Sequence, residues 1–137
     1  MADGSEIVVT FPAGVRADAR AGAFEVRTDQ PREFGGDDSA PAPFTLFLSS
    51  LATCAGFFVV RFCRARGLDT AGVRVVQRSR TNPELHTLAE IDLDIEVPPS
   101  FPERYREALV RAVDQCSVKR AIEARPAFVT RTVVTGG

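Results

Sequence analysis

The three cysteines are the residues of this sequence best suited to chemistry, because a thiolate is a strong nucleophile and a thiol can be oxidised reversibly. Cys54 and Cys63 lie nine residues apart in an apolar stretch that reads as one long helix. That spacing turns the two side chains to opposite faces and separates them by about 13 Å along the helix axis. Because a disulfide needs Cα atoms within about 7 Å, any intramolecular disulfide of the folded chain must use Cys116.

The cysteines have different neighbours, and a buried thiol also serves simply as a small apolar side chain. Cys54 shares a helix face with Ser50 and lies among small residues that permit close approach of another element. Cys63 lies near the end of the helix between Arg61 and Arg64, and we interpret it as structural.

Cys116 precedes the segment Ser117–Ala124, which either continues the helix before it or forms a second short helix. If a new helix starts at Ser117, Cys116 lies at the positive end of that helix, close to Lys119 and Arg120. Both features stabilise a thiolate, so we expect them to favour the ionised form of Cys116.

The other residue types that carry enzyme chemistry form no recognisable pattern. The sole histidine, His86, falls in a turn between two expected strands, where we expect it to be solvated. The sequence holds no Cys-x-x-Cys, no His-Glu-x-x-His and no paired histidines, so no metal site is expected. Gly35-Gly36 does not follow a strand and open a helix, so the sequence gives no support for nucleotide binding.

Length and charge are those of an ordinary globular domain. The 137 residues suit one domain, 1–137, and 45% hydrophobic with 26% charged residues are typical of a folded chain. A net charge of −1 argues against an electrostatic nucleic-acid binder or a membrane-surface protein. Three cysteines are too few for a disulfide scaffold, and no signal peptide is visible, so we expect a cytoplasmic protein.

Phe44–Val60 is a long apolar segment, 17 residues without a charge. A membrane-spanning helix needs about 20 residues, and this segment contains hydroxyl side chains and meets Arg61 at its end. We interpret it as part of a buried helix of a soluble fold, covering roughly 44–66 and stopped by Gly67. A helix that is apolar on all sides must be covered on all sides, which hints at a second subunit.

The flanking segments predict strands and further helices. Two alternating segments around the turn Asn82-Pro83 predict an antiparallel hairpin with arginines beside acidic residues on one solvated face. We interpret these acids as ion-pair partners rather than metal ligands. Ser100 and Glu103 have the spacing of a capping box before the next helix. The order predicts an α+β fold, with additional strands at Glu6–Phe11, Phe24–Thr28 and Phe128–Val134.

Three segments together resemble motifs of the OsmC/Ohr family. Pro41–Cys54, P-x-P-F-T-L-F-L-S-S-L-A-T-C, is similar to the family's central-helix motif, in which a proline precedes a cysteine by eleven residues. Pro31–Gly36 resembles the loop before that helix. Cys116–Ala121 resembles the second cysteine motif, in which proline often follows the cysteine and Ser117 stands here. The order of elements also agrees along nearly the whole chain.

The resemblance implies an OsmC-like fold, with antiparallel sheets around a long buried central helix, in an intertwined homodimer with sites at the subunit interface. It implies thiol-dependent reduction of hydroperoxides, with Cys54 as the peroxidatic cysteine, Cys116 as the resolving cysteine and an external dithiol as reductant. It implies no metal or organic cofactor, and no nucleic-acid or membrane partner. The residues expected around the substrate are Arg32, Phe44, Phe47, Ser50, Phe57 and Phe58. Apolar walls formed by Phe47, Phe57 and Phe58 would favour organic hydroperoxides over hydrogen peroxide.

The implied mechanism needs an arginine that lowers the thiol pKa and holds the peroxide. Arg16, in the segment Gly14-Val15-Arg16, is the best match to the family's arginine motif. Arg20 and Arg32 are the alternatives.

The sequence departs from the family at the glutamate that pairs with this arginine, because Phe44 stands at that position. Glu33 and Asp37 are the loop acids that could replace it. The departure leaves two other functions open. One is a non-catalytic OsmC-like module that binds an apolar small molecule at the dimer interface, and the other is a thiol redox switch.

Overall fold

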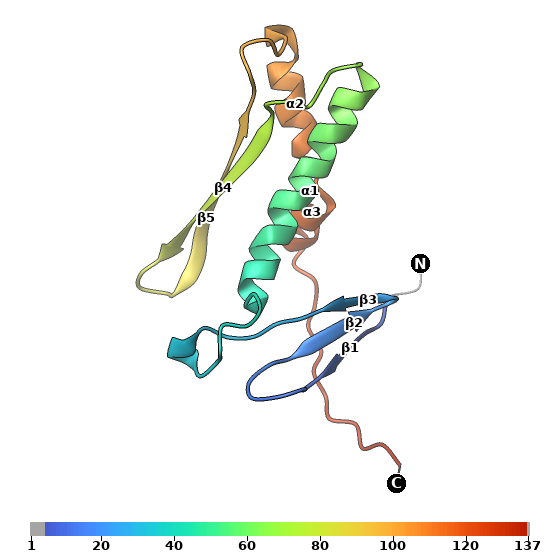
Figure 1. Cartoon of the computed structure of the whole chain (residues 1–137), viewed down its shortest axis with the longest axis vertical. Coiled ribbons are helices and arrows are strands. Elements are labelled where there is room, and N and C mark those ends of the chain that lie inside the picture. Colours follow the sequence, from blue (N-terminus) through green and yellow to red (C-terminus); the bar gives the residue numbers. More distant parts are fainter. Residues whose placement is uncertain (1–4, 137) are drawn as a thin grey trace. The chain divides into compact units, whose positions relative to one another are not determined.

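The computed structural model of the chain describes residues 5–136, which fold as an α+β structure (Figure 1). The contacts within the chain define two compact units, residues 1–49 and 50–137. The sequence predicted one domain over 1–137, and that prediction stays open.

The first unit contains a three-stranded antiparallel sheet in the order β1-β2-β3. The strands are β1 (Ile7–Thr10), β2 (Asp18–Ala21) and β3 (Phe24–Val26). The outer two strands were predicted from their alternating apolar residues. The sequence did not indicate β2, because its four residues, Asp-Ala-Arg-Ala, offer only small apolar side chains to a core. Gly22, with φ of +60°, forms the tight turn between β2 and β3.

Asp29 organises the loop that follows this sheet. Its carboxylate is buried and accepts hydrogen bonds from the hydroxyl and the N–H of Ser39, and from the N–H groups of Gln30 and Asp37. These bonds, those from Ser39 foremost, lower the pKa of Asp29 to about 2. The loop, which contains the short 3₁₀ helix η1 (Arg32–Phe34), is therefore tied together by one ionised side chain.

The long helix α1 (Pro43–Ala65) confirms the prediction within one residue at each end. Gly67, with φ of +65°, follows the helix, and the N–H of Leu68 closes back onto the carbonyl of Cys63 at 2.9 Å. By length and composition alone α1 is apolar enough to cross a membrane, a test that the core helix of a soluble protein also passes.

The expectation that this helix is buried holds for one face only. The buried residues recur at helical spacing and are Leu51, Ala55, Val59, Phe62 and Cys63. Phe57 and Val60 lie on the opposite face and are 58% and 42% exposed. One chain contains too little material to cover every side of an apolar helix, so this face stays open in the single chain.

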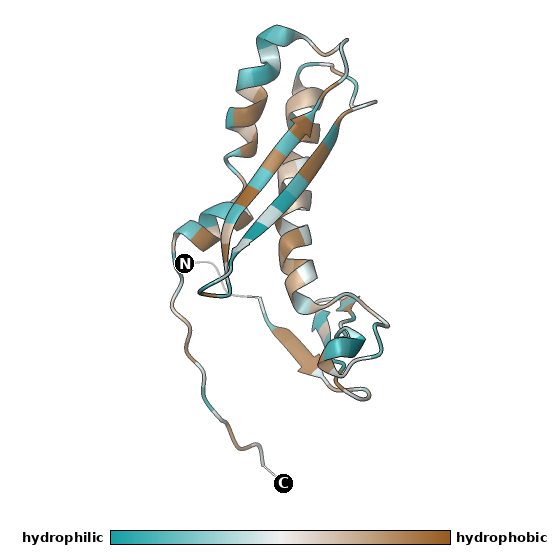
Figure 2. Ribbon diagram, turned by 90° about the vertical axis from the view of Figure 1, so that its left-hand side faces the viewer, coloured by the Kyte–Doolittle hydropathy of each residue, from teal (hydrophilic) through white to brown (hydrophobic). Residues whose placement is uncertain are grey.

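The predicted hairpin is formed by β4 (Arg74–Asn82) and β5 (Thr87–Glu96). Hydrophilic and hydrophobic residues alternate along both strands, as Figure 2 shows. The expected ion pairs form on the exposed face: they are Arg74–Glu96 and Arg78–Asp94, each at 2.7 Å, and Arg80 with Glu90 at 2.6 Å and with Asp92 at 3.1 Å. The acids are thus ion-pair partners, as the sequence indicated.

Asn82 builds the turn of this hairpin, because its side-chain oxygen accepts the N–H groups of Glu84 and Leu85. His86 follows with φ of +53° and is exposed, as predicted for a solvated turn histidine.

The last helices differ from the prediction at their start. A 3₁₀ turn, η2 (Glu103–Tyr105), leads into α2 (Arg106–Val113), and a break separates α2 from α3 (Ser117–Glu123). The predicted capping box is wrong, because the turn begins at Pro102 without a side-chain cap. The chain first turns to bury Phe101, whose N–H bonds to the carbonyl of Pro98, and this leaves Ser100 outside the helix.

The core of the second unit lies between α1, α2 and the inner face of the hairpin. Its buried members are Ala55, Val59, Phe62, Cys63, Phe101, Leu109 and Val113. Val75, Leu93 and Ile95 of the hairpin pack against this cluster from the other side. This core therefore holds the middle of α1 next to the end of α2, where the break before α3 begins.

The predicted strand at Phe128–Val134 is wrong for the single chain. Residues 125–136 form no strand, and Phe128 and Val134 are more than 90% exposed (Figure 1). A strand requires a neighbour to which its N–H and C=O groups can bond, and the described residues supply none to this segment.

Candidate active site

Two of the three cysteines meet at one place in the second unit. Cys54 comes from the middle of α1, and Cys116 lies in the break between α2 and α3. Against the effect of burial, hydrogen bonding with Cys116 lowers the pKa at the sulfur of Cys54. The hydroxyl of Ser117 lies 3.8 Å from the same sulfur. The fold therefore brings together residues that are 62 positions apart in the sequence.

The surroundings of Cys54 stabilise its thiolate. Burial alone would raise the pKa of Cys54, but hydrogen-bond donors outweigh that effect. These donors are the thiol of Cys116, the backbone N–H of Val118, and the hydroxyl and N–H of Ser117. The pKa of Cys54 is therefore held below its ordinary value.

The prediction for Cys116 is wrong in its direction. Burial and the hydrogen bond given to Cys54 raise the pKa of Cys116, and they outweigh the backbone N–H groups of Lys119 and Val118. The ammonium of Lys119 pairs with Asp114 at 3.1 Å. A helix does start at Ser117, and its first N–H groups act on both thiols: those of Ser117 and Val118 lower the pKa of Cys54, and those of Val118 and Lys119 oppose the rise at Cys116.

The three thiols differ in accessibility. Cys54 is only partly buried, whereas Cys116 is 3% exposed and Cys63 is fully buried. Burial raises the pKa of Cys63, which agrees with its interpretation as a structural residue. All three are free thiols in this structure. Cys54 alone combines access with a stabilised thiolate.

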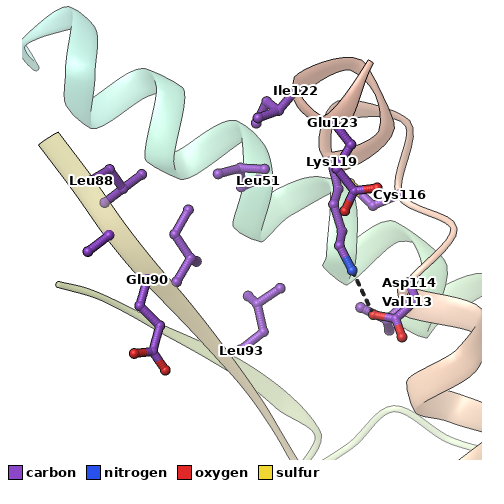
Figure 3. Close-up of a pocket in the computed structure, with 12 residues that line it drawn as sticks. Leu51, Leu88, Glu90, Leu93, Val113, Asp114, Cys116, Lys119, Ile122 and Glu123 are labelled. Atoms are coloured by element: carbon purple, nitrogen blue, oxygen red, sulfur yellow. Dashed lines mark hydrogen bonds and ion pairs between the residues drawn. The ribbon is translucent and has the colours of Figure 1, made fainter. Parts of the chain in front are cut away.

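A cavity of about 440 Å³ lies next to Cys116, and Figure 3 shows it between β5, α1 and the last helices. Its apolar lining consists of Leu51, Leu88, Ala89, Ile91, Leu93, Val113 and Ile122. Its polar lining consists of Glu90, Glu123 and the Lys119–Asp114 ion pair, which is drawn as a dashed line. Cys116 lies on the wall of this cavity, and Cys54 is not one of its lining residues.

The residues predicted around the substrate lie elsewhere on the chain. Phe44 and Phe47 stack in the first turns of α1, with ring centroids 5.6 Å apart. Phe57 and Phe58 form an edge-to-face pair at 5.4 Å. Ser50 lies one helical turn before Cys54 and is half-buried.

None of these predicted residues lines the cavity beside Cys116. Sequence reasoning did not find the cavity because its apolar members, such as Leu93 and Val113, have the same periodicity as ordinary core residues. They come from α1, β5, α2 and α3, four elements that only the folded structure brings together.

The candidate arginines all belong to the first unit. Arg16 pairs with Asp18 at 2.8 Å, and both side chains are largely buried. The Nε of Arg16 and one carboxylate oxygen of Asp18 are buried without a hydrogen-bond partner. Arg20, on β2, and Arg32, in η1, are exposed. The assignment of Arg16 to the thiol site stays a prediction.

Among residues 5–136, no group of three or more histidine, cysteine, aspartate or glutamate side chains is arranged to hold a metal ion.

The sequence matches the family of OsmC-like proteins over residues 36–131, well over half of its length. The chain therefore belongs to the OsmC-like protein family. Among curated proteins, none matches the sequence.

Several solved structures share the fold. A Psychrobacter arcticus protein named for the osmotic stress and detoxification response is 20% identical with a TM-score of 0.73, covering 88% of this chain and 90% of its own. An OsmC-like protein of Mycoplasma pneumoniae is 17% identical with a TM-score of 0.70, covering 91% of each chain. An organic hydroperoxide resistance protein of Legionella pneumophila is 18% identical with a TM-score of 0.57, covering 88% and 89%. At these identities the likeness establishes the fold alone.

Proposed function

We propose that this protein is a thiol-dependent hydroperoxide reductase in which Cys54 is the peroxidatic and Cys116 the resolving cysteine. The observation that carries the proposal is the position of Cys54 at the break before α3: its sulfur lies 3.8 Å from the hydroxyl of Ser117, the residue that follows Cys116, and hydrogen-bond donors there, Cys116 among them, lower its pKa. It supplies a nucleophile and a second thiol within reach of each other, on a fold that organic hydroperoxide resistance proteins also have.

The first step is attack by the Cys54 thiolate on one peroxide oxygen. A sulfur–oxygen bond forms, the oxygen–oxygen bond breaks, and the alkoxide leaves with a proton as the alcohol. Cys54 is oxidised to a sulfenic acid and the peroxide is reduced. The hydroxyl of Ser117, 3.8 Å from the sulfur, is a donor that can support the charge that develops on the leaving oxygen.

The second step joins the two cysteines. The sulfur of Cys116 attacks the sulfenic sulfur of Cys54, a disulfide forms, and water leaves with the oxygen and two protons. Because its pKa is raised, Cys116 remains protonated until this step and keeps donating its hydrogen bond. An external dithiol then reduces the disulfide and is itself oxidised to a disulfide.

We retain Arg16 as the activating arginine. The family's glutamate position is Phe44 here, but Arg16 already has a carboxylate partner in Asp18. A short ion pair fixes a guanidinium in one orientation, which is the task that the missing glutamate performs in relatives. Asp18 is therefore our candidate for the residue that replaces it.

An organic hydroperoxide is the substrate class that we propose. The cavity beside Cys116 is mostly apolar and has room for a hydrocarbon group, which hydrogen peroxide lacks. We also propose a homodimer, because a second subunit would bury the apolar face of α1 that exposes Phe57 and Val60 in the single chain.

We propose the cytoplasm as the compartment of the protein, because free thiols stay reduced in a reducing environment and all three cysteines are free.

Steady-state turnover of cumene hydroperoxide with dithiothreitol tests this function. Cys54→Ser removes the nucleophile and should reduce turnover to the rate without protein. Cys116→Ser should form the Cys54 sulfenic acid but no Cys54–Cys116 disulfide, and its turnover should be slower than that of wild type because dithiothreitol must reduce the sulfenic acid directly. Cys63→Ala is the matched control and should retain the wild-type rate per folded protein. Equal turnover by wild type and Cys54→Ser would contradict the proposal.

The apolar cavity also supports a second candidate, a non-catalytic module that binds an apolar small molecule. The cavity is lined by Cys116 but not by Cys54, and the first turn of α1 presents Phe44 instead of an acid. In that case Cys54→Ser leaves binding of the small molecule unchanged, and wild type consumes no peroxide. A redox switch instead predicts one oxidation per protein without sustained turnover.

A further inference from the structure

A second hollow, separate from the thiols, lies between the C-terminal half of α1 and α2. Its volume is about 390 Å³, within the usual range for small-molecule sites. Its lining residues are Phe58, Arg61, Phe62, Ala65, Arg66, Ala108, Arg111, Ala112 and Gln115. No cysteine belongs to this set, so the proposed redox chemistry does not account for it.

The charge of this hollow is unbalanced. Arg61, Arg66 and Arg111 all line it, and no lining residue is acidic. The chain as a whole has 17 basic and 18 acidic residues. On the hairpin each exposed arginine faces a carboxylate, whereas no ion pair forms at these three arginines among the described residues. Like charges around one concave surface repel each other unless an anion lies between them.

One of the arginines is held in place by its surroundings. The guanidinium of Arg66 stacks over the ring of Phe62 at 3.6 Å and donates a hydrogen bond to the carbonyl of Phe62 at 3.2 Å. The ring of Tyr105 lies 5.6 Å from the same guanidinium. Stacking leaves the edge of a guanidinium free, and that edge is the part that binds a carboxylate with two parallel hydrogen bonds.

The other part of the hollow is apolar. Phe58 and Phe62 contribute aromatic rings, and three alanines contribute methyl groups. Gln115 is the one uncharged polar residue in the lining. A ligand that matches this surface has a negative group for the arginines and a flat apolar body for the rings.

We propose that this hollow is a binding site for a small aromatic carboxylate. The carboxylate pairs with the arginines, and the aromatic body packs against the phenylalanine rings. A simpler explanation for basic residues at these positions is their interaction with the helix dipole near the C-terminal ends of α1 and α2. Arg64 distinguishes the two explanations, because it lies in the last turn of α1 but does not line the hollow.

The test is a calorimetric titration of the reduced full-length protein with 2-naphthoate at low salt. We expect saturable binding that weakens as salt is added, and at least tenfold weaker binding of the neutral analogue 2-naphthylmethanol. The double variant Arg61→Gln/Arg111→Gln should weaken 2-naphthoate binding at least tenfold. The matched control Arg64→Gln carries one of the same charge changes on the same helix and should bind within twofold of wild type.

A second readout uses the wild-type protein and does not depend on how the variants fold. On addition of 2-naphthoate, the amide resonances of Ala112 and Gln115 should shift, and those of the hairpin should not. The proposal is overturned if 2-naphthoate does not bind, if the neutral analogue binds equally well, or if Arg64→Gln weakens binding as much as the double variant. Because no peroxide is present, these outcomes do not depend on the proposed reductase function.

Discussion

Cys54 and Cys116 have opposite pKa shifts: burial and the hydrogen bond to Cys54 raise the pKa of Cys116, whereas the donors around Cys54, Cys116 among them, outweigh burial and lower its pKa. The hydrogen bond from the Cys116 thiol stabilises the thiolate of Cys54 and keeps the proton on Cys116. The different surroundings of the two thiols thus separate the roles of two cysteines that are chemically the same. The hydrogen bond also places the second thiol beside the first before any oxidation takes place.

Selective alkylation should identify Cys54 as the reactive thiol. Iodoacetamide reacts with thiolates, and Cys54 has the lowered pKa while the pKa values of Cys63 and Cys116 are raised. We expect Cys54 to be modified first at neutral pH, and its advantage to shrink as the pH rises and the other thiols ionise. Peptide mapping after short exposures between pH 6 and 10 measures this order. Equal modification of all three thiols at neutral pH would contradict it.

Ser117→Ala should make Cys54 less reactive without disturbing the fold. The variant removes the hydroxyl 3.8 Å from the Cys54 sulfur and keeps the backbone N–H donors. A hydrogen bond to a charged group contributes about 1.5–3 kcal/mol, so alkylation at neutral pH should slow by roughly tenfold or more. Above the pKa of Cys54 the variant and the wild type should react alike. Ser100→Ala, at an exposed serine outside any helix, is the control and should change nothing.

Asp29→Asn should loosen the loop before α1 and remove part of the acid sensitivity of that loop. Because the folded-state pKa of Asp29 is about 2, below the unfolded value of 3.8, its stabilisation is present above pH 4 and is lost as the pH falls towards 2. Amide exchange at Ser39, whose N–H bonds to this carboxylate, measures the effect.

We expect faster exchange of the Ser39 amide in the variant at neutral pH and similar exchange in both proteins near pH 2. Asp38→Asn is the matched control, since Asp38 is exposed and its positive φ of 54° is one that asparagine also adopts. An equal effect of both substitutions would show that Asp29 does not organise the loop.

Gly36→Ala should destabilise the same loop for a steric reason. A Cβ atom at this position would lie 1.9 Å from the carbonyl oxygen of Gln30, a backbone atom that cannot move aside without breaking the loop. We expect a loss of about 2 kcal/mol or more in the free energy of unfolding. Gly56→Ala adds the same methyl group on α1, where nothing lies within 4 Å, and should gain up to about 1 kcal/mol from helix propensity. Thermal unfolding of the two variants beside wild type compares them.

The sequence predicts those elements whose signal is local and periodic. The alternation of polar and apolar residues on both sides of Asn82 predicted the hairpin with its ion pairs. The apolar segment that ends before Gly67 predicted the helix α1. The short strand β2 has no such alternation and was not predicted. The segment at Phe128–Val134 has the composition of a strand, but composition does not supply the neighbouring strand that pairing needs.

The chemistry of the candidate site depended on contacts between distant segments. Helix geometry excluded a Cys54–Cys63 disulfide, but the pairing of Cys54 with Cys116 came from the resemblance to a family. The sequence left open whether the helix breaks before Ser117, and the structure shows that it does. The expected fall in the pKa of Cys116 was wrong, because burial outweighs the N–H groups of the new helix. A sequence shows where a helix can start, but only the packing of α1 shows that the N–H groups of Ser117 and Val118 also reach the sulfur of Cys54.

The most direct test of the proposed function is a thiol count and peptide map after one equivalent of cumene hydroperoxide, beside one equivalent of hydrogen peroxide. We predict the rapid loss of two thiols, a linked peptide that joins Cys54 to Cys116, and faster reaction with the organic peroxide. If Cys54 and Cys116 remain reduced, or oxidise no faster than a free thiol in solution, the assignment of these two residues as a catalytic pair is wrong.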